Sequence, residues 1–74
     1  YIMKNDIKKL FGNKVKQFRL ELGISQEELA FRSGLHRTYI SDLERGNRNV
    51  SLETIQKIAN ALNISIDKLF DTVI

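Results

Sequence analysis

A single glycine, Gly34, divides residues 25–46 into two short runs that each have helical apolar spacing. Ser25 and Glu28 have the spacing of a capping box, in which each side chain bonds a free backbone N–H at a helix start. Gly34 suits the left-handed conformation that ends a helix, which costs a residue with a side chain about 1–2 kcal/mol. The pattern therefore predicts a helix over residues 26–33 that ends in a tight turn.

The second run predicts another helix, over residues 37–45. Ile40 and Leu43 are three residues apart, which places them on one helical face. We expect the core between the two helices to consist of small and apolar side chains, namely Leu29, Ala30, Leu35, Ile40 and Leu43. Two short helices around a glycine turn are typical of a helix-turn-helix unit, whose second helix can enter a DNA major groove. A plain helical hairpin within a small bundle is the alternative explanation.

The rest of the chain also favours helices. Its 74 residues contain no proline and few aromatic residues, which predicts one all-α domain over residues 1–74. Apolar spacings of three and four predict a helix over residues 7–22, with a core stripe formed by Ile7, Phe11, Val15, Phe18 and Leu22. Gly12 costs this helix about 1 kcal/mol relative to alanine, which indicates a close contact with another helix.

Two more helices are expected after residue 50. Ser51 has the position of a cap for a helix over residues 52–62, and Ser65 for a short helix over residues 66–70. With the three earlier segments, they predict a compact five-helix fold.

The charge is unevenly distributed along the chain. The net charge is +3, from 12 basic and 9 acidic residues. Residues 1–50 hold ten basic and six acidic residues, whereas residues 51–74 hold two and three. A basic front and a near-neutral rear suit a polyanion-binding face and a separate packing or dimer face. An ordinary solvated surface is the other explanation of the same counts.

Several classes of protein are disfavoured. The chain has no cysteine, which excludes disulfides and thiolate metal sites and fits the reducing cytoplasm. No apolar run approaches the roughly 20 residues of a membrane span, and no signal-peptide pattern is present. The single histidine, His36, has no second ligand at metal-binding spacing, so we expect capping or a backbone contact there and neither metal nor cofactor. Without an evident nucleophile–base pair or room for a sizeable pocket, an enzyme is not expected.

The residues from Gln26 to Gly46, with the five-helix layout, resemble the lambda-repressor/Cro-like (XRE-type) helix-turn-helix family. The run GLHRTYISDLERGNRNVS, residues 34–51, is more narrowly similar to the controller proteins of restriction–modification systems. The resemblance implies a transcriptional regulator that binds a pseudo-palindromic double-stranded DNA operator as a homodimer, with RNA polymerase as a further candidate partner. A phage or mobile-element Cro/CI-like repressor and an antitoxin that binds a protein toxin are the alternatives.

The resemblance also implies that one side of the second helix of the motif contacts bases, through Arg37, Thr38, Ser41 and Asp42. Arg37 can donate two hydrogen bonds to guanine O6 and N7. Thr38 can offer a hydroxyl to a base or its methyl group to thymine. Phosphates repel Asp42 unless its carboxylate accepts from a cytosine amine or holds Arg37 in place.

Phosphate contacts are implied at both ends of the motif, through Gln26, Tyr39, Arg45, Asn47, Arg48 and Asn49. Gln26 opens the first helix of the motif, where its side chain and the helix amides can meet a phosphate. For Tyr39, packing against that helix is the alternative.

Two structural features are implied as well. Family members often pair an arginine of the first helix with a glutamate that ends the DNA-reading helix, which here implies a salt bridge between Arg19 and Glu44. The dimer interface is expected on the rear face, with Leu52, Ile55, Ile64, Ile66 and Phe70 as candidates, some of which must instead belong to the core.

Overall fold

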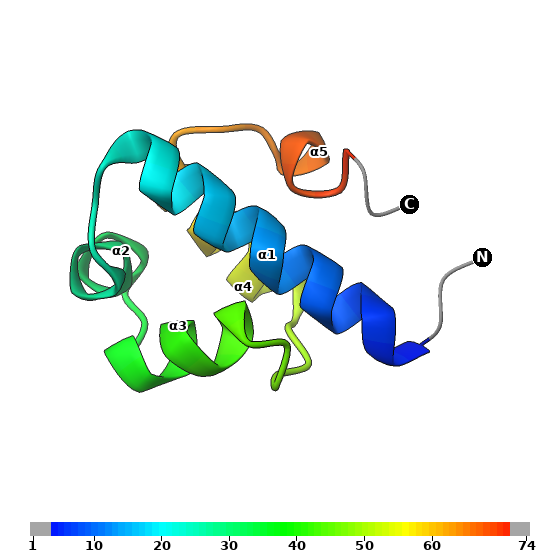
Figure 1. Cartoon of the computed structure of the whole chain (residues 1–74). Helices are drawn as coiled ribbons and strands as arrows, with labels where there is room; N and C mark the ends of the chain where they lie inside the picture. The colour runs from blue at the N-terminus through cyan, green and yellow to red at the C-terminus, as the bar shows by residue number, and fades with distance from the viewer. Residues whose placement is uncertain (1–3, 72–74) are drawn as a thin grey trace.

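The structure is a computed structural model that describes residues 4–71, with side chains from residue 7 onward, and its regular secondary structure is helical (Figure 1). The helices are α1 (Lys4–Leu22), α2 (Gln26–Ser33), α3 (Arg37–Glu44), α4 (Leu52–Leu62) and α5 (Ile66–Leu69). The expected all-α, five-helix fold is confirmed. Within residues 4–71, no helix is both long and apolar enough to cross a membrane.

Three helix ends differ from the expected positions. The first helix begins at Lys4 instead of residue 7, because neither proline nor glycine interrupts residues 4–6. The third helix ends at Glu44, one residue early, since Arg45 is its C-cap with ψ of −2°. The fifth ends at Leu69, because the backbone of Phe70 leaves the helical region with φ of −114°. Shifts of this size are usual at helix ends, where the last turn frays.

The α2 helix is capped at both ends by local chemistry. The Ser25 hydroxyl oxygen accepts from the Glu28 amide at 3.0 Å, as expected. The reciprocal half of the capping box is replaced by a pair along the helix, because the Glu28 carboxylate accepts from Arg32 Nε at 2.8 Å. Gly34 ends the helix with φ of 74°, where a side chain would be strained.

The same chemistry delimits α4 but only partly α5. The Ser51 hydroxyl oxygen accepts from the Thr54 amide at 3.1 Å, and Asn63 closes α4 in the left-handed conformation with φ of 59°. Ser65 precedes α5 but makes no side-chain cap to the backbone. Its side chain instead hydrogen-bonds the Asp67 carboxylate, which lowers the pKa of Asp67.

The core lies between α1, α2, α3 and α4, and α5 packs against α1 and α4 at one end (Figure 1). Its buried side chains are Phe11, Val15, Leu29, Ala30, Ile40, Leu43, Ile55, Ile58, Ala59, Leu62 and Leu69. Leu35 and Phe18 pack against this cluster and are partly buried. Two residues of the expected α1 stripe were wrongly assigned: Ile7 and Leu22 are 36% and 44% exposed, because they lie near the ends of the longest helix.

Gly12 marks the closest approach between α1 and α3. A Cβ atom at this position would collide with the carbonyl oxygens of Leu43 and Glu44, the second at 2.8 Å. The absence of a side chain thus lets α1 lie directly on the last turn of α3. This contact fixes the helix that carries the candidate base-contacting residues.

Candidate DNA-binding surface

A buried ion pair joins α1 to the end of α3. Arg19 Nε donates to Glu44 Oε2 at 2.7 Å, and Arg19 Nη2 donates to Glu44 Oε1 at 3.1 Å. Arg19 Nη1 also donates to the Ile24 carbonyl at 2.9 Å, just ahead of α2. Both charged residues are more than nine-tenths buried, so this bidentate pair holds α3 and the start of α2 in one geometry.

Gln26, the first residue of α2, extends the same network. Its Nε2 donates to Glu44 Oε1 at 3.0 Å, so one N–H of the amide is engaged inside the protein. A side-chain amide has a second N–H and two acceptor positions, which are available for a phosphate contact. Because Glu44 directly precedes Arg45, the two ends of residues 26–45 meet at the last turn of α3 (Figure 1).

The first turn of α3 presents its polar side chains to solvent. Arg37 and Thr38 are exposed, whereas Ser41 and Asp42, one turn later on the same side, are half-buried. Ile40 and Leu43 face inward and are fully enclosed by the core. The helix therefore has a rigid inner face and an outer face that opens on two potential hydrogen-bond donors.

Asp42 is held by arginines other than the one expected. Its Oδ1 accepts from Arg45 Nη2 at 2.5 Å, and its Oδ2 accepts from Arg48 Nη2 at 3.3 Å. Arg45 Nη1 also donates to the Ser41 hydroxyl at 3.1 Å. The expectation that Asp42 holds Arg37 is not met, because the loop after α3 folds back and brings two other guanidinium groups to its carboxylate.

Tyr39 combines both of its expected roles in position. Its ring packs against the core, while the Arg48 guanidinium lies over the ring face with 4.9 Å between the Arg48 Cζ and the centroid. Such a cation–π contact stabilises the arginine in one orientation. Arg48 is thereby placed between Tyr39 and Asp42, on the outer side of α3.

The loop that follows α3 is polar and exposed. Gly46 turns it with φ of 80°, and the Asn47 amide donates to the Asp42 carbonyl at 2.9 Å. The remaining side chains of the expected phosphate set, Arg45, Asn47, Arg48 and Asn49, are all exposed here. His36, at the other end of α3, is the N-cap residue but makes no side-chain cap. Between residues 7 and 71, no three His, Asp or Glu side chains gather as a metal site.

The structure sorts the five candidates for the dimer interface. Ile55 is only 8% exposed and belongs to the core, so it was wrongly included: it lies on the inward side of α4. Ile64 and Phe70 are partly buried against the core, and Phe70 stacks on Phe11 with 5.3 Å between ring centroids. Leu52 and Ile66 are exposed, at 83% and 38%.

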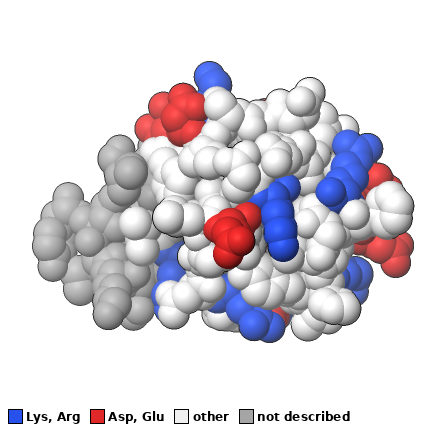
Figure 2. All heavy atoms as spheres, turned by 180° about the vertical axis from the view of Figure 1, so that it is seen from behind, with Lys and Arg blue, Asp and Glu red and all other residues white. Residues whose placement is uncertain are grey.

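The face opposite to that of Figure 1 is largely uncharged. Figure 2 shows scattered acidic and basic side chains separated by neutral surface on the side where α4 lies in Figure 1. This face fits the expected separation of a charged DNA-facing surface and a neutral rear.

Two features of the surface were not anticipated from the sequence. The pairing of Asp42 with Arg45 has a local signal, because residues three apart on a helix are neighbours. The exposure of Phe31, at 83%, has no such signal, since an aromatic residue in α2 is equally compatible with the core.

Comparisons with known proteins agree with this geometry. A family model described as Helix-turn-helix matches residues 15–69. Control protein C.BamHI of Bacillus amyloliquefaciens is 57% identical over 70 residues, which cover 93% of this chain and 86% of the relative. Control protein C.MunI of a Mycoplasma species is 47% identical over 70 residues, covering 93% and 95%.

The solved structures include another controller. The restriction–modification controller protein C.AhdI of Aeromonas hydrophila superposes with a TM-score of 0.83 at 51% identity, covering 88% of this chain and 97% of its own. The controller C.Esp1396I has been solved as a tetramer with its natural 35 base-pair operator. It gives a TM-score of 0.83 at 36% identity and covers 90% of this chain and 88% of its own.

Proposed function

The chain belongs to the helix-turn-helix family that its residues 15–69 match, and we propose that it is a transcriptional regulator of the restriction–modification controller type. It binds a pseudo-palindromic operator as a homodimer, acts in the cytoplasm, and has no enzymatic activity of its own. Contact with RNA polymerase is the route by which such a regulator activates a promoter. A region of residues 1–74 without a second domain would act through its concentration and the arrangement of operators.

The observation that carries this proposal is the contrast between the two faces of α3. The inner face is fixed by Ile40, Leu43 and the buried Glu44, while Arg37 and Thr38 are exposed at the N-terminal turn. In a helix-turn-helix unit, the N-terminal residues of the second helix contact base edges in the major groove. Arg37 is thus the principal base-contacting residue, with Thr38 beside it.

Asp42 takes a different role in this proposal. Its carboxylate is neutralised by Arg45 and Arg48, both of which belong to the phosphate set. An aspartate that binds two arginines keeps their guanidinium groups at defined positions beside the groove and offsets part of their charge. We therefore assign Asp42 to the positioning of phosphate-contacting arginines and leave the base edges to Arg37, Thr38 and Ser41.

The phosphate set comes together at one end of α3. Gln26 lies at the N-terminus of α2, where the first amides of a helix have no intrahelical acceptor and the dipole attracts an anion. Arg45, Asn47, Arg48 and Asn49 follow directly after Glu44, the residue that Gln26 contacts. Contacts of this kind fix the register of the protein on the duplex, and the base contacts then supply the sequence preference.

The experiment that tests the function is selection of bound duplexes from random DNA, followed by footprinting on the selected sequence. The expected result is a pseudo-palindrome whose half-site centres are about 34–36 Å apart. Binding should weaken steeply with salt, because each neutralised phosphate releases counterions. A selection that enriches no sequence would contradict the proposal.

The genes beside the coding sequence test the controller assignment separately. An adjacent methyltransferase and endonuclease are expected for a controller. Their absence, together with a selected operator, would instead favour the phage or mobile-element repressor.

A further inference from the structure

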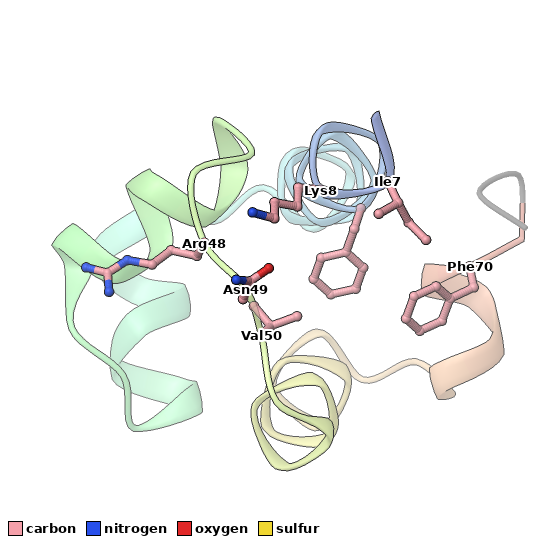
Figure 3. A pocket seen from close by; sticks show the side chains of 7 residues that line it. Ile7, Lys8, Arg48, Asn49, Val50 and Phe70 are labelled. Carbon is pink, nitrogen blue, oxygen red and sulfur yellow. The ribbon is translucent and has the colours of Figure 1, made fainter. Parts of the chain in front are cut away.

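An apolar groove lies between α1, the segment before α4, and α5 (Figure 3). We name it the α1–α5 groove; its lining residues are Ile7, Lys8, Phe11, Asn49, Val50 and Phe70, with the backbone side of Arg48 at one edge. The Arg48 guanidinium points away from the groove toward α3, consistent with its contacts to Tyr39 and Asp42. The floor is therefore apolar, and Lys8 is the cationic side chain at its rim.

The size of the groove selects the kind of occupant. Its cavity volume is about 200 Å³. Small-molecule sites usually measure about 300–1,000 Å³ and carry several convergent polar groups. The α1–α5 groove is smaller and is floored by Phe11, Val50 and Phe70, so it suits an inserted apolar side chain better than a metabolite.

The side chain that can fill such a groove lies next to it on the same surface. Leu52 is 83% exposed and stands two residues after Val50, which lines the groove. In an isologous dimer, the same surface patch of each protomer faces its counterpart. A two-fold axis that passes between Leu52 and the α1–α5 groove would place each Leu52 in the groove of the other protomer.

The charges around these features are complementary in the same arrangement. Glu53, directly after Leu52, is exposed, and Lys8 lies at the rim of the groove. An exchange of Leu52 across the two-fold axis would bring Glu53 of one protomer toward Lys8 of the other. Complementary charges at the rim favour this register over a contact between two copies of the same charge.

We propose that the α1–α5 groove receives Leu52 from a second copy of this chain and that this exchange holds the homodimer together. The inference rests on the homodimer of the proposed function and names the contact that forms it. It also joins the dimer contact to the DNA-facing loop, because Asn49 and the backbone of Arg48 border the groove. Filling the groove would then fix the segment that carries two residues of the phosphate set.

The first test compares two equally exposed residues. Leu52→Ala should weaken the dimer dissociation constant by at least about 10-fold in sedimentation equilibrium, because both copies of the side chain are lost from the interface. The control is Phe31→Ala, since Phe31 is also 83% exposed but lies on α2, away from the groove. It should leave the dimer constant unchanged. Neither side chain is in the core, so both variants should keep the wild-type melting temperature.

The second test uses the absence of cysteine from the chain. Protein with Leu52→Cys is mixed with protein carrying Lys8→Cys and treated with a short thiol-to-thiol cross-linker. The expected product is a covalent dimer that contains one copy of each variant. Replacing Leu52→Cys by Phe31→Cys should abolish this product.

Operator binding shows whether Leu52 acts through the dimer. Leu52→Ala should lose occupancy at low protein concentration and regain wild-type occupancy above its own, weaker dimer constant. Failure to recover there would overturn the inference. An unchanged dimer constant with no mixed cross-link would also overturn it, since the groove would then hold the chain's own terminal residues or another protein. Either result, with wild-type operator binding intact, leaves the proposed function standing. A wild-type protein that is monomeric and selects no DNA would contradict both.

Discussion

Arg19 and Glu44 lie 25 positions apart in the sequence and form a bidentate ion pair whose two hydrogen bonds measure 2.7 and 3.1 Å. Each partner is more than nine-tenths buried, and the remaining donors of Arg19 are used by the Ile24 carbonyl. The pair therefore connects α1, the start of α2 and the end of α3 without leaving a buried polar group exposed to an apolar neighbour. It determines how α3 is presented to DNA.

Removing one member of this pair should strongly destabilise the fold. Glu44→Ala leaves the Arg19 guanidinium buried without its counter-charge, and breaking a buried pair in this way costs about 3–5 kcal/mol. The free energy of unfolding from urea titration measures the effect. The control is Glu28→Ala, which removes the exposed pair with Arg32 and should change stability by less than about 1 kcal/mol. Equal effects of the two substitutions would contradict a structural role for Glu44.

Gly12→Ala should destabilise the protein although alanine is the better helix former. The helix propensity gains about 1 kcal/mol, but the new Cβ would collide with the Leu43 and Glu44 carbonyl oxygens. Backbone atoms cannot rotate aside, so we expect a net loss of about 1–3 kcal/mol, as for overpacked cores. Thermal and urea unfolding measure it. Asn13→Ala, at an exposed neighbour in α1, is the control and should be neutral or slightly stabilising. A stabilising Gly12→Ala would show that α1 and α3 are farther apart than described.

Asp42→Asn distinguishes a positioning role from a base contact. Loss of the carboxylate leaves Arg45 and Arg48 without their partner, which adds positive charge beside the phosphates. We expect tighter binding to non-specific DNA, a salt dependence steeper by about one unit, and an unchanged preferred base at every operator position. The assays are binding titrations at several salt concentrations and repeated selection from random DNA.

The control for Asp42→Asn is Glu21→Gln, which removes one negative charge from the exposed surface of α1. It changes the net charge equally but should affect DNA binding much less. A change of base preference at one operator position in Asp42→Asn would instead assign Asp42 to a base edge.

The parts of the fold that follow from local chemistry could be predicted from the sequence. Ser25 and Ser51 bond the amides three residues ahead, and Gly34 adopts the left-handed conformation, because these features depend only on neighbouring backbone. Gly12 was also informative, since a glycine within a long helix needs a packing reason.

The rest depends on distant segments and could not be derived from spacing. Leu52 and Ile55 have the same apolar character and lie in the same helix, yet Leu52 is exposed and Ile55 is buried. Which of them faces the core depends on how α4 docks on α1 and α2. Asp42 is a similar case, because its contact with Arg48 arises only after Gly46 turns the loop back toward α3.

The most direct test of base recognition by α3 is the operator affinity and base preference of Arg37→Ala. Arg37 is exposed, so the variant should fold normally. It should lose about 1–3 kcal/mol of operator binding and its preference at one base pair per half-site. Arg32→Ala, an exposed arginine on α2 paired with Glu28, is the matched control and should keep the wild-type preference at every position. An Arg37→Ala protein that binds the same operator with wild-type affinity and selectivity would contradict recognition through the first turn of α3.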